Sequence, residues 1–72
     1  MTEKIFITTD FITLSAFLKL AGAAETGGHA KDIIAVGKVL INGDVCLQKG
    51  KKLYGCEIVT AGGHSYEVSR CT

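Results

Sequence analysis

The order of apolar and polar positions changes period twice along this chain of 72 residues. Residues 4–9, KIFITT, alternate and are rich in β-branched side chains, which predicts a strand. From residue 14 the apolar positions follow a helical period, with Thr13 as a candidate N-cap and Gly22 as the stop. The apolar face of this first helix is formed by Leu14, Phe17, Leu18 and Ala21.

A second helix is predicted to begin near residues 26–28 and to end at Gly37, because a glycine readily takes the left-handed conformation of a helix C-cap. Lys31 and Asp32 fall outside its apolar stripe and should face solvent. The stripe itself consists of Ala30, Ile33, Ile34 and Gly37.

Beyond the second helix the apolar period becomes two. The segments KVLI and DVCL flank Asn42-Gly43, which is the strongest short signal for a type I′ hairpin. The segments CEIVT and SYEVSR form a second hairpin around AGGH, and the basic stretch QKGKKLYG between the hairpins is predicted to be a loop.

These elements give the order β-α-α-β-β-β-β without a linker, a repeat or a low-complexity segment. We expect residues 1–72 to form one α+β domain, with two packed helices against a small, mostly antiparallel sheet. A chain of this length buries only about 60% of the surface that it exposes when unfolded, so the core must be small.

Charge is distributed unevenly, although the net charge is only +1. Residues 31–52 contain five lysines and two aspartates, an excess of three positive charges, whereas the rest of the chain has an excess of two negative charges. Such asymmetry indicates an anionic partner, with a merely solvated surface as the alternative.

The cysteines and histidines give no sign of a metal site or of catalysis. Cys46, Cys56 and Cys71 are odd in number and form no Cys-x-x-Cys pair, which predicts free thiols in a reducing compartment. His29 and His64 are far apart in sequence, so zinc is disfavoured. A cysteine nucleophile paired with His64 would lack an orienting third residue, and we therefore expect no enzyme, no metal and no cofactor.

The apolar segments are too short or too polar for targeting or membrane insertion. The N-terminus, MTEKIFITTD, lacks the basic start of a signal peptide, and FITLSAFLKLAGAA is interrupted by polar residues. The expectation is a cytoplasmic monomer that does not associate with membranes.

The start of the second helix is a candidate anion site. A helix N-terminus offers unpaired N–H groups, and Gly27 and Gly28 would leave them uncovered, with His29 and Lys31 in the first turn. The alternative is that the two glycines only allow a tight turn between the helices.

Further cations crowd the segments that follow. They are Lys38, Lys49, Lys51 and Lys52, and we expect them to extend the same positive face. The chain has few aromatic residues, and most are predicted to lie in the core, so recognition of RNA by shape and backbone is favoured over base stacking.

The motif order resembles the S-four-like RNA-binding domain, first seen in ribosomal small-subunit protein four. The resemblance covers roughly residues 12–60: a leucine-bearing helix, then GGHAKDIIAVGKVLINGD, then KGKKLYGCEI. ITLSAFLKLAG, GGHAK and GKKL are similar to the stand-alone YaaA-like subgroup. The central Gly-x-Val-x-Val-Asn-Gly pattern is matched by Gly37, Val39, Ile41, Asn42 and Gly43.

This resemblance implies an αL-type fold and non-catalytic binding to structured RNA, either ribosomal or transfer RNA, with the ribosome or a ribosomal subunit as a candidate partner. In other members the domain is attached to a pseudouridine synthase or a tyrosyl-tRNA synthetase, where it binds the RNA while another domain carries out the chemistry. A small protein-interaction module with solvated lysines is the rival function. The RNA-binding positions that match are Gly27, Gly28, His29, Lys31, Lys38, Lys49, Lys51 and Lys52.

The chain departs from the family pattern at three places. Many members carry Ser-Arg where this chain has Gly28-His29, and an arginine where it has Thr13, which predicts modest affinity. YGCE replaces the usual Gly-Asp turn, with Glu57 keeping an acid in that neighbourhood.

Overall fold

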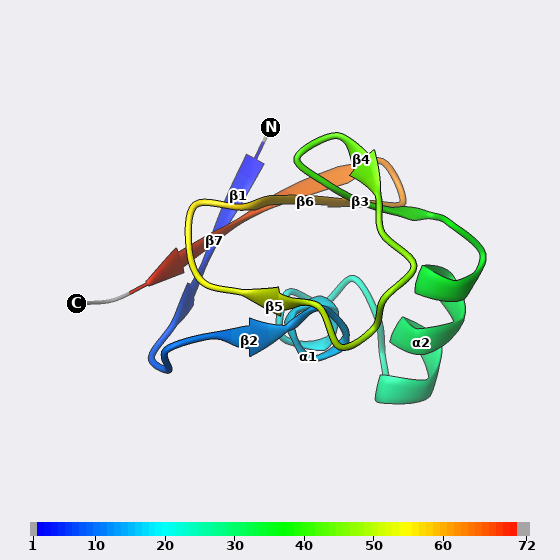
Figure 1. Cartoon of the computed structure of the whole chain (residues 1–72), viewed down its shortest axis with the longest axis horizontal. Coiled ribbons are helices and arrows are strands. Elements are labelled where there is room, and N and C mark those ends of the chain that lie inside the picture. Colours follow the sequence, from blue (N-terminus) through cyan, green and yellow to red (C-terminus); the bar gives the residue numbers. More distant parts are fainter. Residues whose placement is uncertain (1, 71–72) are drawn as a thin grey trace.

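A computed structural model describes residues 2–70 of the chain. Its elements follow the order β-β-α-α-β-β-β-β-β (Figure 1). They are β1 (Thr2–Ile7), β2 (Ile12–Thr13), α1 (Leu14–Leu20), α2 (Gly27–Ala35), β3 (Val39–Ile41), β4 (Asp44–Val45), β5 (Lys52–Leu53), β6 (Ile58–Ala61) and β7 (His64–Arg70).

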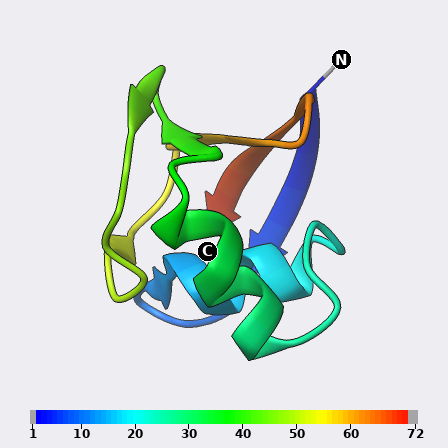
Figure 2. The same cartoon turned by 90° about the vertical axis from the view of Figure 1, so that its right-hand side faces the viewer.

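Five of the strands form one mixed sheet in the order β1-β7-β6-β3-β4. Only β1 and β7 pair in parallel, and the other neighbours are antiparallel. The two helices pack against each other and cover one face of this sheet (Figure 2). The predicted α+β class, with two helices against a mostly antiparallel sheet, is confirmed.

The core is formed where the predicted apolar stripes meet. Leu14, Phe17 and Leu18 of α1 are fully buried, as is Ala30 of α2, and Ile34 is 1% exposed. Alternate residues of the sheet complete the layer. They are Val39, Val59, Ala61, Tyr66 and Val68.

Both hairpins form at the predicted turns. Asn42 and Gly43 have φ angles of +52° and +89°, the two positive values that a type I′ turn requires. The Asn42 side chain also accepts a hydrogen bond from the Ile58 amide at 3.0 Å, which ties the turn to the start of β6. Gly62 and Gly63, in the second turn, likewise have positive φ.

The prediction that residues 48–55 form a loop was wrong in one respect. Lys52 and Leu53 form β5, which pairs antiparallel with β2 in a separate two-stranded ribbon beside α1 (Figure 1). Leu53 is fully buried and contributes to the core. Neither strand has enough residues to show a period of two, so the pairing depends on contacts between distant segments.

Some boundaries also differ from the prediction. The first strand is Thr2–Ile7 rather than residues 4–9, and α2 ends at Ala35, before Gly37. Gly37 has a φ of +77°, as expected for the residue that reverses the chain after a helix. No helix within residues 2–70 is long and apolar enough to cross a membrane.

Candidate nucleic-acid interface

The basic segment between the hairpins is held against the N-terminus of α1 by its own backbone. The Leu14 amide donates to the carbonyl oxygen of Lys51 at 2.8 Å, and the Ser15 amide donates to that of Lys49 at 3.1 Å. Thr13 is the N-cap residue, as predicted, but its side chain makes no capping hydrogen bond. The two carbonyl groups satisfy amides that a helix start leaves unpaired, and they fix the position of the lysines.

The N-terminus of α2 is capped differently. The Thr26 hydroxyl accepts from the His29 amide at 3.0 Å, and the Thr26 carbonyl accepts from the Ala30 amide at 3.0 Å. Within residues 2–70, the amides of Gly27 and Gly28 meet no hydrogen-bond acceptor. This helix start can therefore donate to an external anion.

The two helix starts and the basic segment enclose a shallow depression of about 370 Å³, which we call the α2 depression. Lys31 and Lys49, 18 positions apart in sequence, are its charged residues, and no carboxylate lines it. It is lined by Thr13, Ser15, Gly27, Gly28, Lys31, Lys49 and Gly50. The arrangement offers two cations, two hydroxyls and the backbone amides of a helix start to one ligand.

The backbone does not require glycine at either of the two positions that begin α2. A Cβ on Gly27 would have no atom within 4 Å, and one on Gly28 would meet only the Thr26 hydroxyl oxygen at 3.9 Å. Neither residue has a positive φ, in contrast to Gly22 and Gly37. Neither sterics nor backbone conformation therefore demands glycine at these two positions, and the lack of side chains there leaves the amides uncovered.

The other predicted binding residues lie around two further depressions. His29 and Lys38 line one between the start of α2 and the β6–β7 turn, together with His64, which the sequence reasoning did not select. The Nδ1 atom of His29 accepts from the Glu25 amide at 3.2 Å, so its Nε2 is the ring nitrogen that can donate outward.

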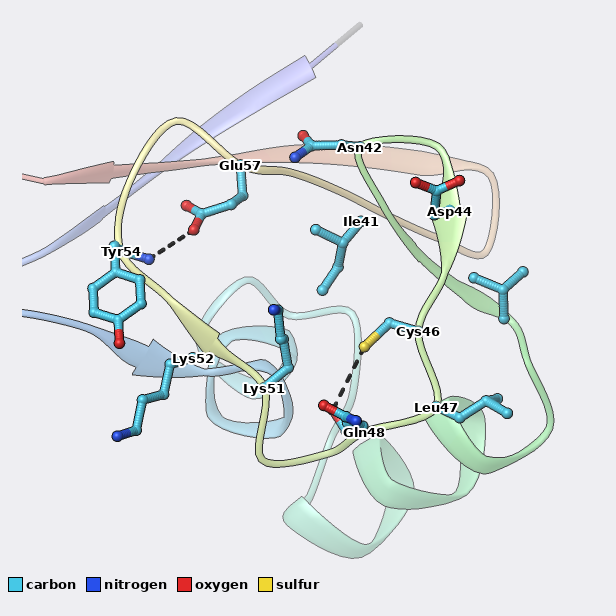
Figure 3. A pocket seen from close by; sticks show the side chains of 11 residues that line it. Ile41, Asn42, Asp44, Cys46, Leu47, Gln48, Lys51, Lys52, Tyr54 and Glu57 are labelled. Atoms are coloured by element: carbon cyan, nitrogen blue, oxygen red, sulfur yellow. Dashed lines mark hydrogen bonds between the residues drawn. The ribbon is translucent and has the colours of Figure 1, made fainter.

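Lys51 and Lys52 line the remaining depression, beside the β3–β4 hairpin. Figure 3 shows the Lys51 side chain pointing into this depression, whereas the Lys52 side chain points away on the side of Tyr54. The predicted cations thus line three depressions: Lys31 and Lys49 share one, whereas Lys38, Lys51 and Lys52 line the other two. That all of them belong to one positive face stays a prediction.

Glu57 has a structural role in the YGCE segment, which stands where the family pattern has a Gly-Asp turn. Its carboxylate accepts from the Tyr54 amide at 2.8 Å and from the Gly55 amide at 2.6 Å (Figure 3 shows the first of these bonds). Cys56 has a φ of +69°, a left-handed conformation that is uncommon for a residue other than glycine. The acid thus fixes the backbone of the turn.

The prediction that most aromatic residues belong to the core was wrong. Phe17 and Tyr66 are buried, but Phe6, Phe11 and Tyr54 are 62%, 39% and 53% exposed. The residues around Phe11 and Tyr54 gave no periodic signal, because both aromatic residues lie beside the short β2–β5 ribbon.

The thiols and histidines form no recognisable reactive centre in the described part of the chain. Within residues 2–70 there is no cluster of three His, Cys, Asp or Glu residues that could hold a metal ion. The Cys46 thiol donates to the carbonyl oxygen of Gln48 at 3.7 Å, and Cys56 is exposed. Cys71 lies outside the described residues.

Known proteins share this fold. A solution structure of YbcJ from Escherichia coli, described as revealing an αL motif involved in RNA-binding, superimposes with a TM-score of 0.67 at 34% identity over 94% of this chain and 85% of that chain. The ribosomal protein S4e of Thermoplasma acidophilum gives a TM-score of 0.63 at 22% identity, over 83% of this chain and 32% of that chain. The second likeness concerns the fold alone.

Sequence relatives agree with the structural match. A Bacillus subtilis protein named "Probable ribosome maturation protein RlbA" is 40% identical over 63 residues, which cover 88% of this chain and 89% of that protein. YbcJ is 39% identical over 57 residues, covering 79% of this chain and 81% of its own length. The model of the S4 domain matches residues 5–69. The predicted resemblance is confirmed, and the chain belongs to the S4 domain family.

Proposed function

We propose that this chain is a non-catalytic protein that binds structured RNA through the phosphate backbone, with the α2 depression as its main contact. The observation that carries the proposal is the pairing of Lys31 and Lys49 at an open helix start that no carboxylate lines. Ribosomal RNA is the proposed target, and transfer RNA is the comparison to be tested against it.

The chemistry of the α2 depression suits a phosphate group. The Gly27 and Gly28 amides lie at the positive end of the helix dipole, where an anion is stabilised. Lys31 and Lys49 add point charges that can neutralise phosphates and release counterions. Such contacts position a protein on RNA without reading its sequence, so we expect recognition of shape.

The relatives support this proposal. The solution structure of YbcJ is described in terms of RNA-binding, and the name of RlbA refers to ribosome maturation. We propose that the chain acts as a monomer in the cytoplasm, on ribosomal RNA or on an assembling ribosomal subunit. The rival is a protein-interaction module whose lysines are only solvated.

Electrophoretic mobility shifts with folded ribosomal RNA and with transfer RNA at low salt test the proposal. The double variant Lys31→Ala, Lys49→Ala should weaken binding to ribosomal RNA about tenfold or more. It should also flatten the dependence of log K on log salt by up to about one unit per lysine.

The matched control removes two exposed lysines outside the α2 depression, Lys4 and Lys19. We expect it to change affinity and salt slope much less than the Lys31/Lys49 variant. Absence of any shift at tens of micromolar wild-type protein, an order of magnitude taken from non-specific affinities, would favour the protein-interaction module. Crosslinking in cells, followed by sequencing of the bound RNA, would identify the target.

A further inference from the structure

Two exposed aromatic rings and a lysine form a cluster on the outer side of the β2–β5 ribbon. The ring centroids of Phe11 and Tyr54 are 6.0 Å apart, with an interplanar angle of 51°. The Nζ atom of Lys52 lies 4.8 Å from the centroid of the Phe11 ring. We call Phe11, Lys52 and Tyr54 the aromatic platform.

The ribbon register explains why these three side chains meet. Ile12 pairs with Leu53 and Thr13 with Lys52, so the same antiparallel register brings Phe11 opposite Tyr54. Successive strand residues point to opposite faces, which turns Leu53 into the core and leaves Lys52 and Tyr54 outside.

The platform is held in place from one end. The carboxylate of Glu57 accepts from the amides of Tyr54 and Gly55, which fixes the backbone that carries the tyrosine ring. Those two bonds also direct the Glu57 carboxylate to the backbone of the turn. Tyr54 remains 53% exposed in this fixed position, with Phe11 supporting one side.

Resting on the proposed function, we propose that Tyr54 stacks on an unpaired nucleobase of the bound RNA, with Phe11 as its support and Lys52 beside the adjoining phosphate. Base stacking on an exposed aromatic ring tolerates any base, because every base has a π-face. The ring–ring contact and the lysine over the Phe11 ring distinguish this pair from Phe6, which is exposed on the edge strand β1.

The platform is continuous with the α2 depression. Thr13 lines that depression, and it is also the partner of Lys52 in the ribbon. One RNA strand can therefore place a phosphate between Lys31 and Lys49 and extend across Thr13 towards Tyr54. The ligand class is accordingly a structured RNA with an unpaired base beside the contacted phosphates, rather than a perfect duplex.

The test compares two RNA hairpins that have the same stem, one with a single bulged purine and one fully paired, both closed by the same stable tetraloop. Wild-type protein should bind the bulged RNA more tightly. Tyr54→Leu should weaken binding to the bulged RNA about tenfold and leave binding to the paired RNA and the salt slope unchanged, because no charge is removed. Tyr54→Phe should retain the preference, because the ring remains.

Phe6→Leu is the matched control, since it removes an exposed ring outside the platform, and it should not alter either affinity. Upfield shifts of the Tyr54 ring protons on addition of the bulged RNA, and not of the paired RNA, would support stacking directly. Equal losses for both RNAs in Tyr54→Leu, or no loss for the bulged RNA, would overturn the stacking role while leaving phosphate binding intact. If wild-type protein binds neither RNA at low salt, the proposed function fails, and this inference fails with it.

Discussion

The N-termini of the two helices lie near each other but differ in what satisfies them. At α1, the amides of Leu14 and Ser15 donate to the carbonyl oxygens of Lys51 and Lys49. At α2, the Thr26 side chain caps one amide, and the first two residues are glycines. One helix start is used to hold the basic segment, and the other is left open to a ligand.

A small domain can position lysine side chains by backbone hydrogen bonds, without an extensive core. Backbone carbonyls of Lys49 and Lys51 anchor the segment, so the lysine side chains need not pack to be positioned. The same anchoring brings Lys49 to Lys31 across the α2 depression. The hydrogen bonds at the start of α1 thereby add the charge of Lys49 to the open start of α2.

The largest effect is expected when the basic segment is released from the start of α1. Leu53 is fully buried in β5, the strand that follows the anchoring carbonyls, and Leu53→Ala should lower the free energy of unfolding by about 2–5 kcal/mol. Hydrogen exchange at the Leu14 and Ser15 amides should accelerate. Denaturant unfolding measures the first effect, and NMR measures the second.

Val45→Ala serves as its control, because that side chain is 57% exposed and its loss should change the unfolding free energy by less than about 0.5 kcal/mol. Equal effects of the two substitutions would show that β5 does not anchor the segment.

The open end can be filled with a negative charge. Gly28→Glu should reduce RNA affinity at least about tenfold, or 1.4 kcal/mol, because the carboxylate would occupy the position of the phosphate. The melting temperature should not fall, since an acid in the first helical turn interacts favourably with the dipole. Gly28→Gln adds a side chain of the same size without the charge, so a similar loss in both variants would indicate obstruction rather than repulsion.

Single lysine substitutions should distinguish how much each depression contributes to RNA binding. Lys49→Ala should lower the salt slope of RNA binding by up to about one unit, whereas Lys51→Ala should lower it less, because the Lys51 side chain points into the depression beside the β3–β4 hairpin. Salt titrations of both variants measure the difference. The earlier expectation of one continuous face requires the two slopes to fall equally.

The smallest effect is expected for Gly28→Ala, and it should have opposite signs for folding and binding. A methyl group at this position meets only ordinary contact, so replacing glycine in the helix should stabilise the protein by up to about 1 kcal/mol. RNA affinity should fall a few-fold, because the amide is less accessible. A variant that melts at a lower temperature than wild type would show that the fold requires this glycine.

Much of the fold could be predicted because its signals are local. The stripe of Leu14, Phe17 and Leu18 identified α1, and Asn42-Gly43 identified the first hairpin, since each needs only neighbouring residues to define it. The lysines near the start of α2 and in the basic segment could be selected as candidates by charge alone.

The sequence by itself determined two amphipathic helices, two hairpins and a local excess of positive charge, because periodicity and turn chemistry act over a few residues. Only the tertiary structure decided which cations share a site. Pairing between Ile12 and Leu53 joins segments that no local pattern relates, and it sets both the approach of Lys49 to Lys31 and the outward position of Tyr54. Such pairing is selected by the burial of Leu53 in a core that exists only once the helices and the sheet have met.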